Sequence, residues 1–331
     1  MPSRKPRRFR NAIEMRRTLA GLVALAMICP TPVTAQQQPE ARIKLDVEMV
    51  LVDATVKDKA GHVMDELKKE DFRLDQEGVQ QEIVHFSRGQ LPLAVAIVVQ
   101  ENRWAQSFLR PLRYATLSVL KALKPEDQVA LFAFADNVER RVDLTADKSK
   151  VAAQVDTIGQ SLGAGTNIND AVFQAAEYLR EKAPAARRAI ILVSDNTPAD
   201  CRKGESHEKV LRTALEAETT VYSLKLPYRG PVALDSMLEH WLVNVGKLTA
   251  ETGGEVIDLE KEGSLFVAFQ TILTRLRTRY AIGFYPAPKM DDNKFHKLNL
   301  ALAPTFGNRG HDYQMIARTG YYASNARAAS R

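Results

Sequence analysis

Three short polar stretches supply side chains that could bind a ligand. Each combines carboxylate, amide or hydroxyl groups that donate or accept hydrogen bonds. The stretches are Gln100-Glu101-Asn102-Arg103-Trp104, Gly163-Ala164-Gly165-Thr166-Asn167 and Ser194-Asp195-Asn196-Thr197. The first and third follow continuous apolar runs at 93–99 and 189–193, which are typical of strands buried on both faces. In an open α/β sheet the ligand crevice lies beyond the carboxyl ends of such strands, so we expect these stretches to border it.

The sequence lacks the usual signatures of catalysis and of cofactor binding. Residues 100–107 contain no glycine for a nucleotide-binding turn, and no GxxxxGK[ST] occurs. A GxSxG elbow and an HExxH pair are also missing, and the 6 histidines are scattered, so a zinc site has no support. Cys201 and His207 are a conceivable nucleophile and base, but we interpret Cys201 as a free cysteine in a surface loop. We expect no enzyme and no cofactor, with a hydrolase that uses Cys201 as an alternative.

The elements that must position the three stretches alternate between strand and helix. Apolar runs predict strands at 93–99, 129–134, 189–193, 220–226 and 255–259, with an antiparallel edge strand at 138–144. Helical spacing predicts helices near 109–123, 148–158, 166–179, 210–215, 237–248 and 265–276. This alternation implies right-handed crossovers and an α/β fold with a doubly wound, mostly parallel sheet.

Both flanks of this region have β character. The alternation at 43–56 changes phase after Leu51, which predicts a bulge or bend in a long strand, and short strands follow at 72–74 and 83–86. Further strands are predicted at 280–285, 297–302 and 313–317. We therefore divide the chain into a leader at 1–35, an N-terminal β segment at 36–90, the α/β domain at 91–278 and a C-terminal β segment at 279–331. Each flank is marginal for a core of its own, so we expect the two to pair into one small β-module.

Residues 1–35 have the three parts of a secretory signal. A basic region ends at Arg16-Arg17, and the apolar run 19–28 is shorter than the roughly 20 residues that span a bilayer. Val33 and Ala35 then have the spacing of a cleavage site. An uncleaved membrane anchor is the alternative, and the start codon could be Met1 or Met15. We expect an exported protein, periplasmic or secreted, whose mature chain has no membrane span.

The net charge of +6 belongs to this leader. The leader holds seven basic residues and one acidic residue, and the 46 basic residues less seven and the 40 acidic residues less one leave 39 of each. A neutral mature chain gives no support for a nucleic-acid partner. Cleavage would also remove Cys29 and leave Cys201 alone, which excludes an intramolecular disulfide.

Three local motifs stand inside the α/β region: 123–131 (LKPEDQVAL), 165–171 (GTNINDA) and 252–255 (TGGE). Together with the order of the elements, they resemble the von Willebrand factor type A domain, in which the second motif is usually GT-x-L-x-DA. The flanks resemble a bacterial family of exported VWFA-related proteins first described in Acidobacteria, through 52–58 (VDATVKD), Gly61, 70–72 (EDF), 280–286 (YAIGFYP) and 317–321 (ARTGY). The resemblance covers nearly all of 45–323.

The resemblance implies a divalent-cation site that a carboxylate of the partner completes. The family holds the ion with a D-x-S-x-S loop, a threonine and an aspartate, and by position Thr166 and Asp195 match the last two. The first loop differs from the family's D-x-S-x-S pattern. Gln100 occupies the position of the aspartate, and Asn102 and Trp104 occupy the positions of the two serines. One carboxylate is lost and an indole replaces a hydroxyl. We therefore expect a degenerate site that binds no metal, with Thr166 and Asp195 as vestigial positions.

Structural roles for the same side chains stay open. Thr166 or Asn167 could be the N-cap of a helix. Asp195 could hold the turn at 196–198. Trp104 could be an exposed aromatic anchor for a partner, or it could pack under the first helix.

We expect a non-catalytic function, the binding of an unidentified protein of the cell envelope. The partner-binding residues would be Gln100, Glu101, Asn102, Trp104, Thr166 and Asp195. Glu101 differs from the rest of this set, because side chains alternate along an extended strand and Glu101 should point away from its neighbours. The alternative is an adhesin-like binder that holds Mg²⁺ or Mn²⁺ through Thr166, Asp195 and waters.

The leader gives the first testable prediction. When the full chain is expressed in a bacterium that exports proteins, cleavage should follow Ala35, and the mature N-terminus should be Gln36. Mass spectrometry of the intact protein from the cell envelope measures this. A mature protein that begins upstream of Leu19 would contradict the prediction.

Overall fold

The computed structural model describes residues 49–89, 91–103, 105–160, 163–197, 204–228, 244–289, 292–306 and 312–323. All of these residues belong to one compact unit within 46–331. The predicted leader, Trp104, Cys201 and the first part of the helix expected at 237–248 lie outside the described residues.

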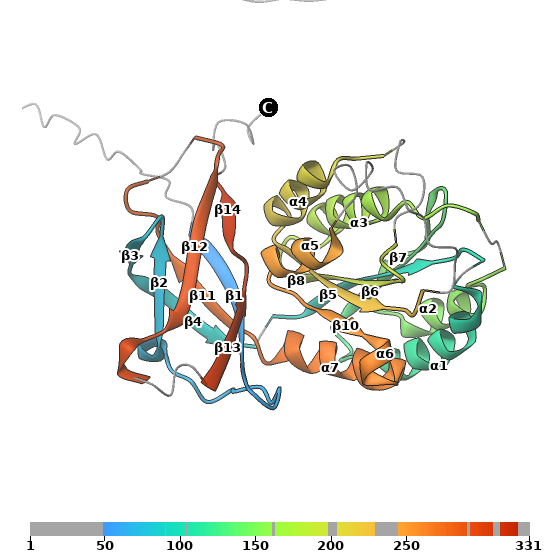
Figure 1. Ribbon diagram of the computed structural model, residues 1–331, viewed down its shortest axis with the longest axis horizontal. Helices are drawn as coiled ribbons and strands as arrows, with labels where there is room; N and C mark the ends of the chain where they lie inside the picture. Colours follow the sequence, from blue (N-terminus) through green and yellow to red (C-terminus); the bar gives the residue numbers. More distant parts are fainter. Residues whose placement is uncertain are drawn as a thin grey trace, which may run out of the picture. The chain divides into compact units, whose positions relative to one another are not determined.

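A six-stranded sheet forms the centre of the α/β region, in the order β10-β9-β8-β5-β6-β7 (Figure 1). Its strands are β5 (Leu93–Gln100), β6 (Gln128–Phe134), β7 (Val138–Thr145), β8 (Arg187–Ser194), β9 (Thr219–Lys225) and β10 (Val256–Asp258). Only β7 is antiparallel to its neighbour, as the sequence predicts. Every residue of β5 and β8 is buried, so the expectation of strands covered on both faces is confirmed.

Helices cover both faces of this sheet (Figure 1). One face packs against α1 (Gln106–Ala122), α2 (Lys148–Val155) and α7 (Leu265–Arg277), and the other against α3 (Ile168–Lys182), α4 (His207–Glu216) and α5 (Val245–Glu251). Side chains alternate between the two cores, since Val95 and Ile97 of β5 face the first group and Ala94 and Ala96 face the second. The predicted doubly wound α/β fold is therefore confirmed. The sequence did not predict the short α6 (Leu259–Glu262).

The two flanks pair with each other in two four-stranded sheets, β13-β1-β11-β4 and β14-β12-β2-β3. We call these sheets the β-module. From the N-terminal flank come β1 (Val50–Asp58), β2 (Phe72–Gln76), β3 (Val79–Gln81) and β4 (Ile83–Arg88); from the C-terminal flank come β11 (Tyr280–Phe284), β12 (Phe295–Leu302), β13 (Tyr313–Ala317) and β14 (Gly320–Tyr322). β1 pairs with both β11 and β13, and β2 pairs with β12. The predicted pairing of the flanks is thus confirmed, and the domain boundaries themselves stay predictions.

One core joins the two sheets of the β-module, and Tyr280 lies at its centre. The Tyr280 side chain is fully buried, and its ring lies 5.0 Å from that of Phe72 and 5.5 Å from that of Phe86. Its hydroxyl donates to the Met64 carbonyl at 2.8 Å and accepts the Leu67 N–H at 2.9 Å. A residue of the C-terminal flank therefore helps to anchor an N-terminal loop, which otherwise pairs with β1 through the Val63–Lys57 bridge and the bond from the Met64 N–H to the Val56 carbonyl.

Arginine side chains connect the β-module to the α/β region. Arg187 of β8 donates to both carboxylate oxygens of Asp53 on β1, at 2.9 and 3.1 Å, and to the Leu276 carbonyl at 2.9 Å. Arg279, which is fully buried, donates to the Thr220 hydroxyl and to the Gly253 carbonyl. Arg187 and Arg279 are themselves buried, so their N–H groups need the acceptors that these contacts provide within the protein.

Replacing Tyr280 with Phe should lower the free energy of unfolding by about 1–3 kcal/mol, because it leaves the buried Met64 carbonyl and Leu67 N–H without their shared partner. Chemical denaturation followed by circular dichroism measures the loss. Tyr285→Phe is the matched control, since Tyr285 is 49% exposed, and it should leave the stability unchanged. Equal stabilities of the two variants would show that the Tyr280 hydroxyl does not hold the loop.

Candidate functional site

The three polar stretches meet at the carboxyl edge of the central sheet. Gln100 ends β5, Ser194 ends β8, and Thr166 precedes α3. β5 and β8 are adjacent parallel strands, and the strand order reverses between them. This is the switch point where open α/β sheets place their ligand crevices, so the location expected from the sequence agrees with the structure.

The side-chain amide of Gln100 has an orientation that its neighbours determine. Its Oε1 accepts the Asp195 backbone N–H at 3.0 Å and the Ser194 hydroxyl at 2.7 Å. Because a backbone N–H can only donate, the opposite nitrogen must face the centre of the site. There Nε2 donates to Asp195 Oδ2 at 3.0 Å and approaches the Thr166 hydroxyl at 3.5 Å.

Asn102 is oriented in the same way. Its Oδ1 accepts the Ala105 N–H at 3.0 Å, and its Nδ2 donates to Thr166 Oγ1 at 2.9 Å. The side-chain NH₂ groups of both amides therefore face Thr166 and Asp195. The four side chains of Gln100, Asn102, Thr166 and Asp195 form one hydrogen-bonded network, which we call the closed network.

Asp195 is the carboxylate of the closed network. Its Oδ1 accepts the Thr197 N–H at 2.9 Å. This bond agrees with a role in holding the following residues, and residue 198 of the expected turn lies outside the described residues. Burial raises the pKa of Asp195, and the hydrogen bonds from Thr197 and Gln100 oppose that rise by stabilising the charged form. The carboxylate thus depends on amide donors for its charge compensation.

Glu101 points away from the closed network, as the strand alternation predicts. Its Oε2 accepts from Arg141 Nη2 of β7 at 3.1 Å, and the side chain is only 2% exposed. Burial raises the pKa of Glu101, and the Arg141 charge opposes that rise. Glu101 is therefore a structural residue in this arrangement, and its expected contact with a partner has no geometric support.

The structure also shows which residue caps α3 and how far the predicted partner-binding side chains are buried. Asn167, rather than Thr166, is the N-cap of α3, with its side chain accepting the Asp170 N–H at 3.2 Å. Gln100, Asn102, Thr166 and Asp195 are all less than 5% exposed. A partner would therefore meet the loops around them before it met these side chains. Their direct contact with a partner stays a prediction, as does the role of Trp104.

The sequence analysis missed Asp136, which supports the second polar stretch. Asp136 Oδ2 accepts the Ala164 N–H at 3.0 Å. A Cβ at Gly163 would lie 2.3 Å from the Ala135 Cβ, and one at Gly165 would lie 2.5 Å from Asp136 Oδ1. Glycine is required at both positions for this close approach, and the Gly-x-Gly spacing was the signal in the sequence.

The described residues contain no group of three or more His, Cys, Asp or Glu side chains placed to hold a metal ion. Nor does any helix within the described ranges have the length and apolar character needed to cross a membrane.

A comparison with solved structures finds partial matches to proteins of several bacteria. An aerotolerance-related membrane protein of Bacteroides fragilis is 15% identical, with 56% of this chain and 98% of that chain covered and a TM-score of 0.43. BatB of Bacteroides thetaiotaomicron is 16% identical, with the same coverage and a TM-score of 0.41. The PilB minor pilin of Streptococcus sanguinis is 14% identical, with 58% and 63% covered and a TM-score of 0.41. A comparison with curated protein sequences finds no match.

A family model gives the more direct assignment. The model of the von Willebrand factor type A domain matches residues 100–197. The match begins at Gln100 and ends at Thr197, so it includes all three polar stretches. Together with the strand order and the loops at the carboxyl edge of the sheet, it shows that this chain contains a von Willebrand factor type A domain.

Proposed function

We propose that this domain binds another protein, without catalysis and without a bound metal ion, through the face that the three polar stretches form. The domain type supports an interaction role. The observation that carries the metal-free part of the proposal is the orientation of the Gln100 and Asn102 amides. Both turn their N–H groups toward Thr166 and Asp195.

A cation at this position would need oxygen ligands. Mg²⁺ requires near-octahedral oxygen coordination and gives up its water reluctantly. In the closed network the hydrogens of two amides already point at Thr166 Oγ1 and Asp195 Oδ2. Flipping the Gln100 amide would turn its NH₂ group against the Asp195 backbone N–H, a donor facing a donor. The residues present therefore do not fit the metal site that the family implies.

The proposal of a non-catalytic role has separate support. The Ser194 hydroxyl donates to Gln100 Oε1 and accepts the Asn196 N–H at 2.9 Å, so it is engaged in structure. Asp195 is held by hydrogen bonds from Thr197 and Gln100. A general base needs a substrate proton within hydrogen-bond reach. These buried groups instead form hydrogen bonds with one another.

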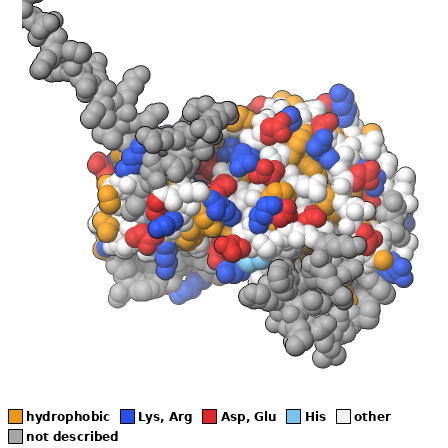
Figure 2. Space-filling view, turned by 90° about the horizontal axis from the view of Figure 1, so that it is seen from above, with side chains coloured by type: hydrophobic (Ala, Val, Ile, Leu, Met, Phe, Trp, Pro, Cys, Tyr) orange, Lys and Arg blue, Asp and Glu red, His pale blue; other side chains and the backbone are white. Residues whose placement is uncertain are grey.

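The identity of the partner is proposed from charge and export. Among the described residues on the face in Figure 2, basic and acidic side chains are interspersed. This distribution supports a protein partner better than a nucleic acid, which would favour a basic patch. The leader supports export, so we propose that the partner is a protein of the cell envelope.

The metal-free proposal predicts that binding of the partner survives chelation. The mature chain, used to capture proteins from extracts of its own cell envelope, should retain the same partner with EDTA as with Mg²⁺. Loss of the partner in EDTA would favour the alternative, a Mg²⁺- or Mn²⁺-dependent adhesin. Capture with and without each ion, quantified by mass spectrometry, distinguishes the two.

The same proposal predicts that metal binding can be restored. The triple variant Gln100→Asp, Asn102→Ser, Trp104→Ser supplies the missing carboxylate and hydroxyls. An attraction between two unit charges a few Å apart is worth ~1–4 kcal/mol at effective dielectrics of 80 to 20, which is a lower bound for a dication. Titration calorimetry should therefore detect Mg²⁺ or Mn²⁺ binding that is up to a few hundred-fold tighter in the variant than in the wild type. The variant with Thr166→Val added is the matched control and should weaken binding again. Tight binding by the wild type would contradict the proposal.

A further inference from the structure

His207, at the start of α4, carries a buried imidazole that forms no hydrogen bond. Both ring nitrogens are buried, and neither contacts a hydrogen-bonding group in the part of the chain that the structure describes. A neutral imidazole has one N–H donor and one acceptor nitrogen, so two polar atoms are left unsatisfied. Buried polar groups of this kind are rare in folded proteins, and a reason is expected for each. The proposed function does not use this side chain.

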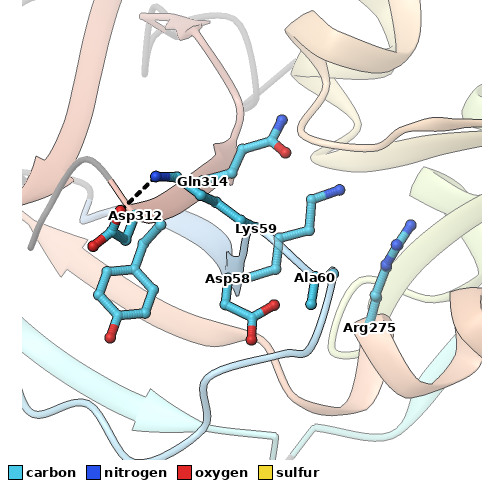
Figure 3. A pocket seen from close by; sticks show the side chains of 9 residues that line it. Asp58, Lys59, Ala60, Arg275, Asp312 and Gln314 are labelled. Atoms are coloured by element: carbon cyan, nitrogen blue, oxygen red, sulfur yellow. Dashed lines mark hydrogen bonds and ion pairs between the residues drawn. The ribbon is translucent and has the colours of Figure 1, made fainter.

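Other groups of the same protein that carry or can carry a positive charge have carboxylate partners. The His296 ring contacts Asp292 Oδ1 at 2.8 Å. In the polar cavity between β1, β13 and α7, Lys59 reaches Asp312 (Figure 3). A carboxylate bonded to a cationic group stabilises its charged form. His207 has no such bond, so its surroundings favour the neutral imidazole.

The place of His207 in its helix also disfavours a positive charge. His207 is the first residue of α4 and directly follows the N-cap, Ser206. The N–H groups of the first turn give a helix N-terminus a partial positive charge, which repels a protonated side chain. Burial is the largest cause that lowers the pKa of His207 below its ordinary range.

The charged side chains around the imidazole pair with one another. On α5, Lys247 lowers the pKa of His207 and Glu251 raises it, and these two side chains lie 3.8 Å apart as an ion pair. On α4 itself, Lys209 pairs with Glu205 of the preceding loop at 2.7 Å. These charges therefore oppose each other and leave burial as the main influence on the ring.

The start of α4 is connected to α5 and to α3. Val210 of α4 packs in the same core as Val245 and Leu248 of α5. In the loop before α4, the Glu205 N–H donates to Asp170 Oδ1 of α3 at 2.8 Å. Because α3 begins directly after the second polar stretch, a change at the start of α4 would reach the carboxyl edge of the sheet.

We propose that His207 is a pH-sensitive lock at the start of α4, closed while the ring is neutral and opened by its protonation at mildly acidic pH. A buried histidine that must charge is a known basis for such switches. Opening would expose the ring nitrogens to water and loosen the contacts of α4 with α5 and α3. The lock does not depend on the proposed binding of a partner.

The direction of the pH effect follows from the neutral closed form. An opened chain binds a proton at His207 near the ordinary pKa of about 6.5, whereas the closed form binds one only at a lower pH. The closed form therefore keeps its full stability above about pH 6.5 and loses stability as the pH falls toward the lowered pKa. Within that interval the equilibrium constant for opening should rise by up to about tenfold for each pH unit.

Hydrogen exchange of the mature chain, followed by mass spectrometry and corrected for the intrinsic exchange rate, tests the lock at about pH 7.5, 6.5 and 5.5. Peptides of α4 and α5 should lose protection about threefold or more over this range, beyond any loss in β5 and β8. His207→Phe keeps an aromatic ring that cannot titrate, and it should remove this extra loss. His62→Phe is the matched control, because the His62 side chain is 80% exposed, and it should behave as the wild type.

A direct titration of the wild type decides the matter even where His207→Phe fails to fold. NMR of the histidine rings should place the midpoint of His207 below about pH 6.5. A midpoint at or above that pH would overturn the proposal. So would an extra loss of protection in α4 and α5 that persists unchanged in a folded His207→Phe variant, or protection in these helices that does not depend on pH in the wild type.

Discussion

The burial of β5 at the centre of the parallel sheet is the constraint on which the rest of the structure depends. β5 pairs with β6 and β8, and both of its faces are covered by helices. Its last residue, Gln100, is therefore fully buried at the switch point. A buried amide must have its hydrogen bonds satisfied within the protein. Ser194, Asp195 and Thr166 supply them, and this requirement brings together stretches that are 66 and 95 residues away in the sequence.

The same constraint underlies the proposal that this site keeps the architecture of the family without its metal chemistry. An aspartate at the end of β5 would face Asp195 across the crevice, and two close carboxylates need a cation between them. Glutamine offers a donor at that place and an acceptor for the Asp195 N–H. Under the proposed metal-free function, the amide would take the place of both the cation and the carboxylate of the family's pattern. Asn102 completes the arrangement by donating to Thr166. The closed network stabilises the three loops by hydrogen bonds within the protein.

The junction between the β-module and the α/β region relies on a different principle. Arg187, Arg279 and Arg318 donate to backbone carbonyls that lie in or near the junction. A planar guanidinium can serve several oxygens at once, which a lysine cannot do in the same geometry. Arg187 also binds Asp53, so one side chain connects β8, α7 and β1. At the edge of this junction Lys57 and Arg275 both pair with Glu255.

The sequence alone determined the elements whose signals are local. Continuous apolar runs identified β5 and β8, helical spacing identified α1, α3 and α7, and the β character of both flanks led to their pairing. The sequence did not predict very short elements such as β3, β14 and α6, because three or four residues carry too little periodicity. The tertiary structure decided the rest. Only packing showed that Asn167 rather than Thr166 caps α3, that Glu101 pairs with Arg141, and which way the amides of Gln100 and Asn102 turn. Glu101 and Gln100 meet partners 40 and 95 residues away, and no local pattern encodes which donor will meet which acceptor. The Asn167 cap and the Asn102 bond to Ala105 each span three residues, and there the conformation of the loop decides which polar side chain is used.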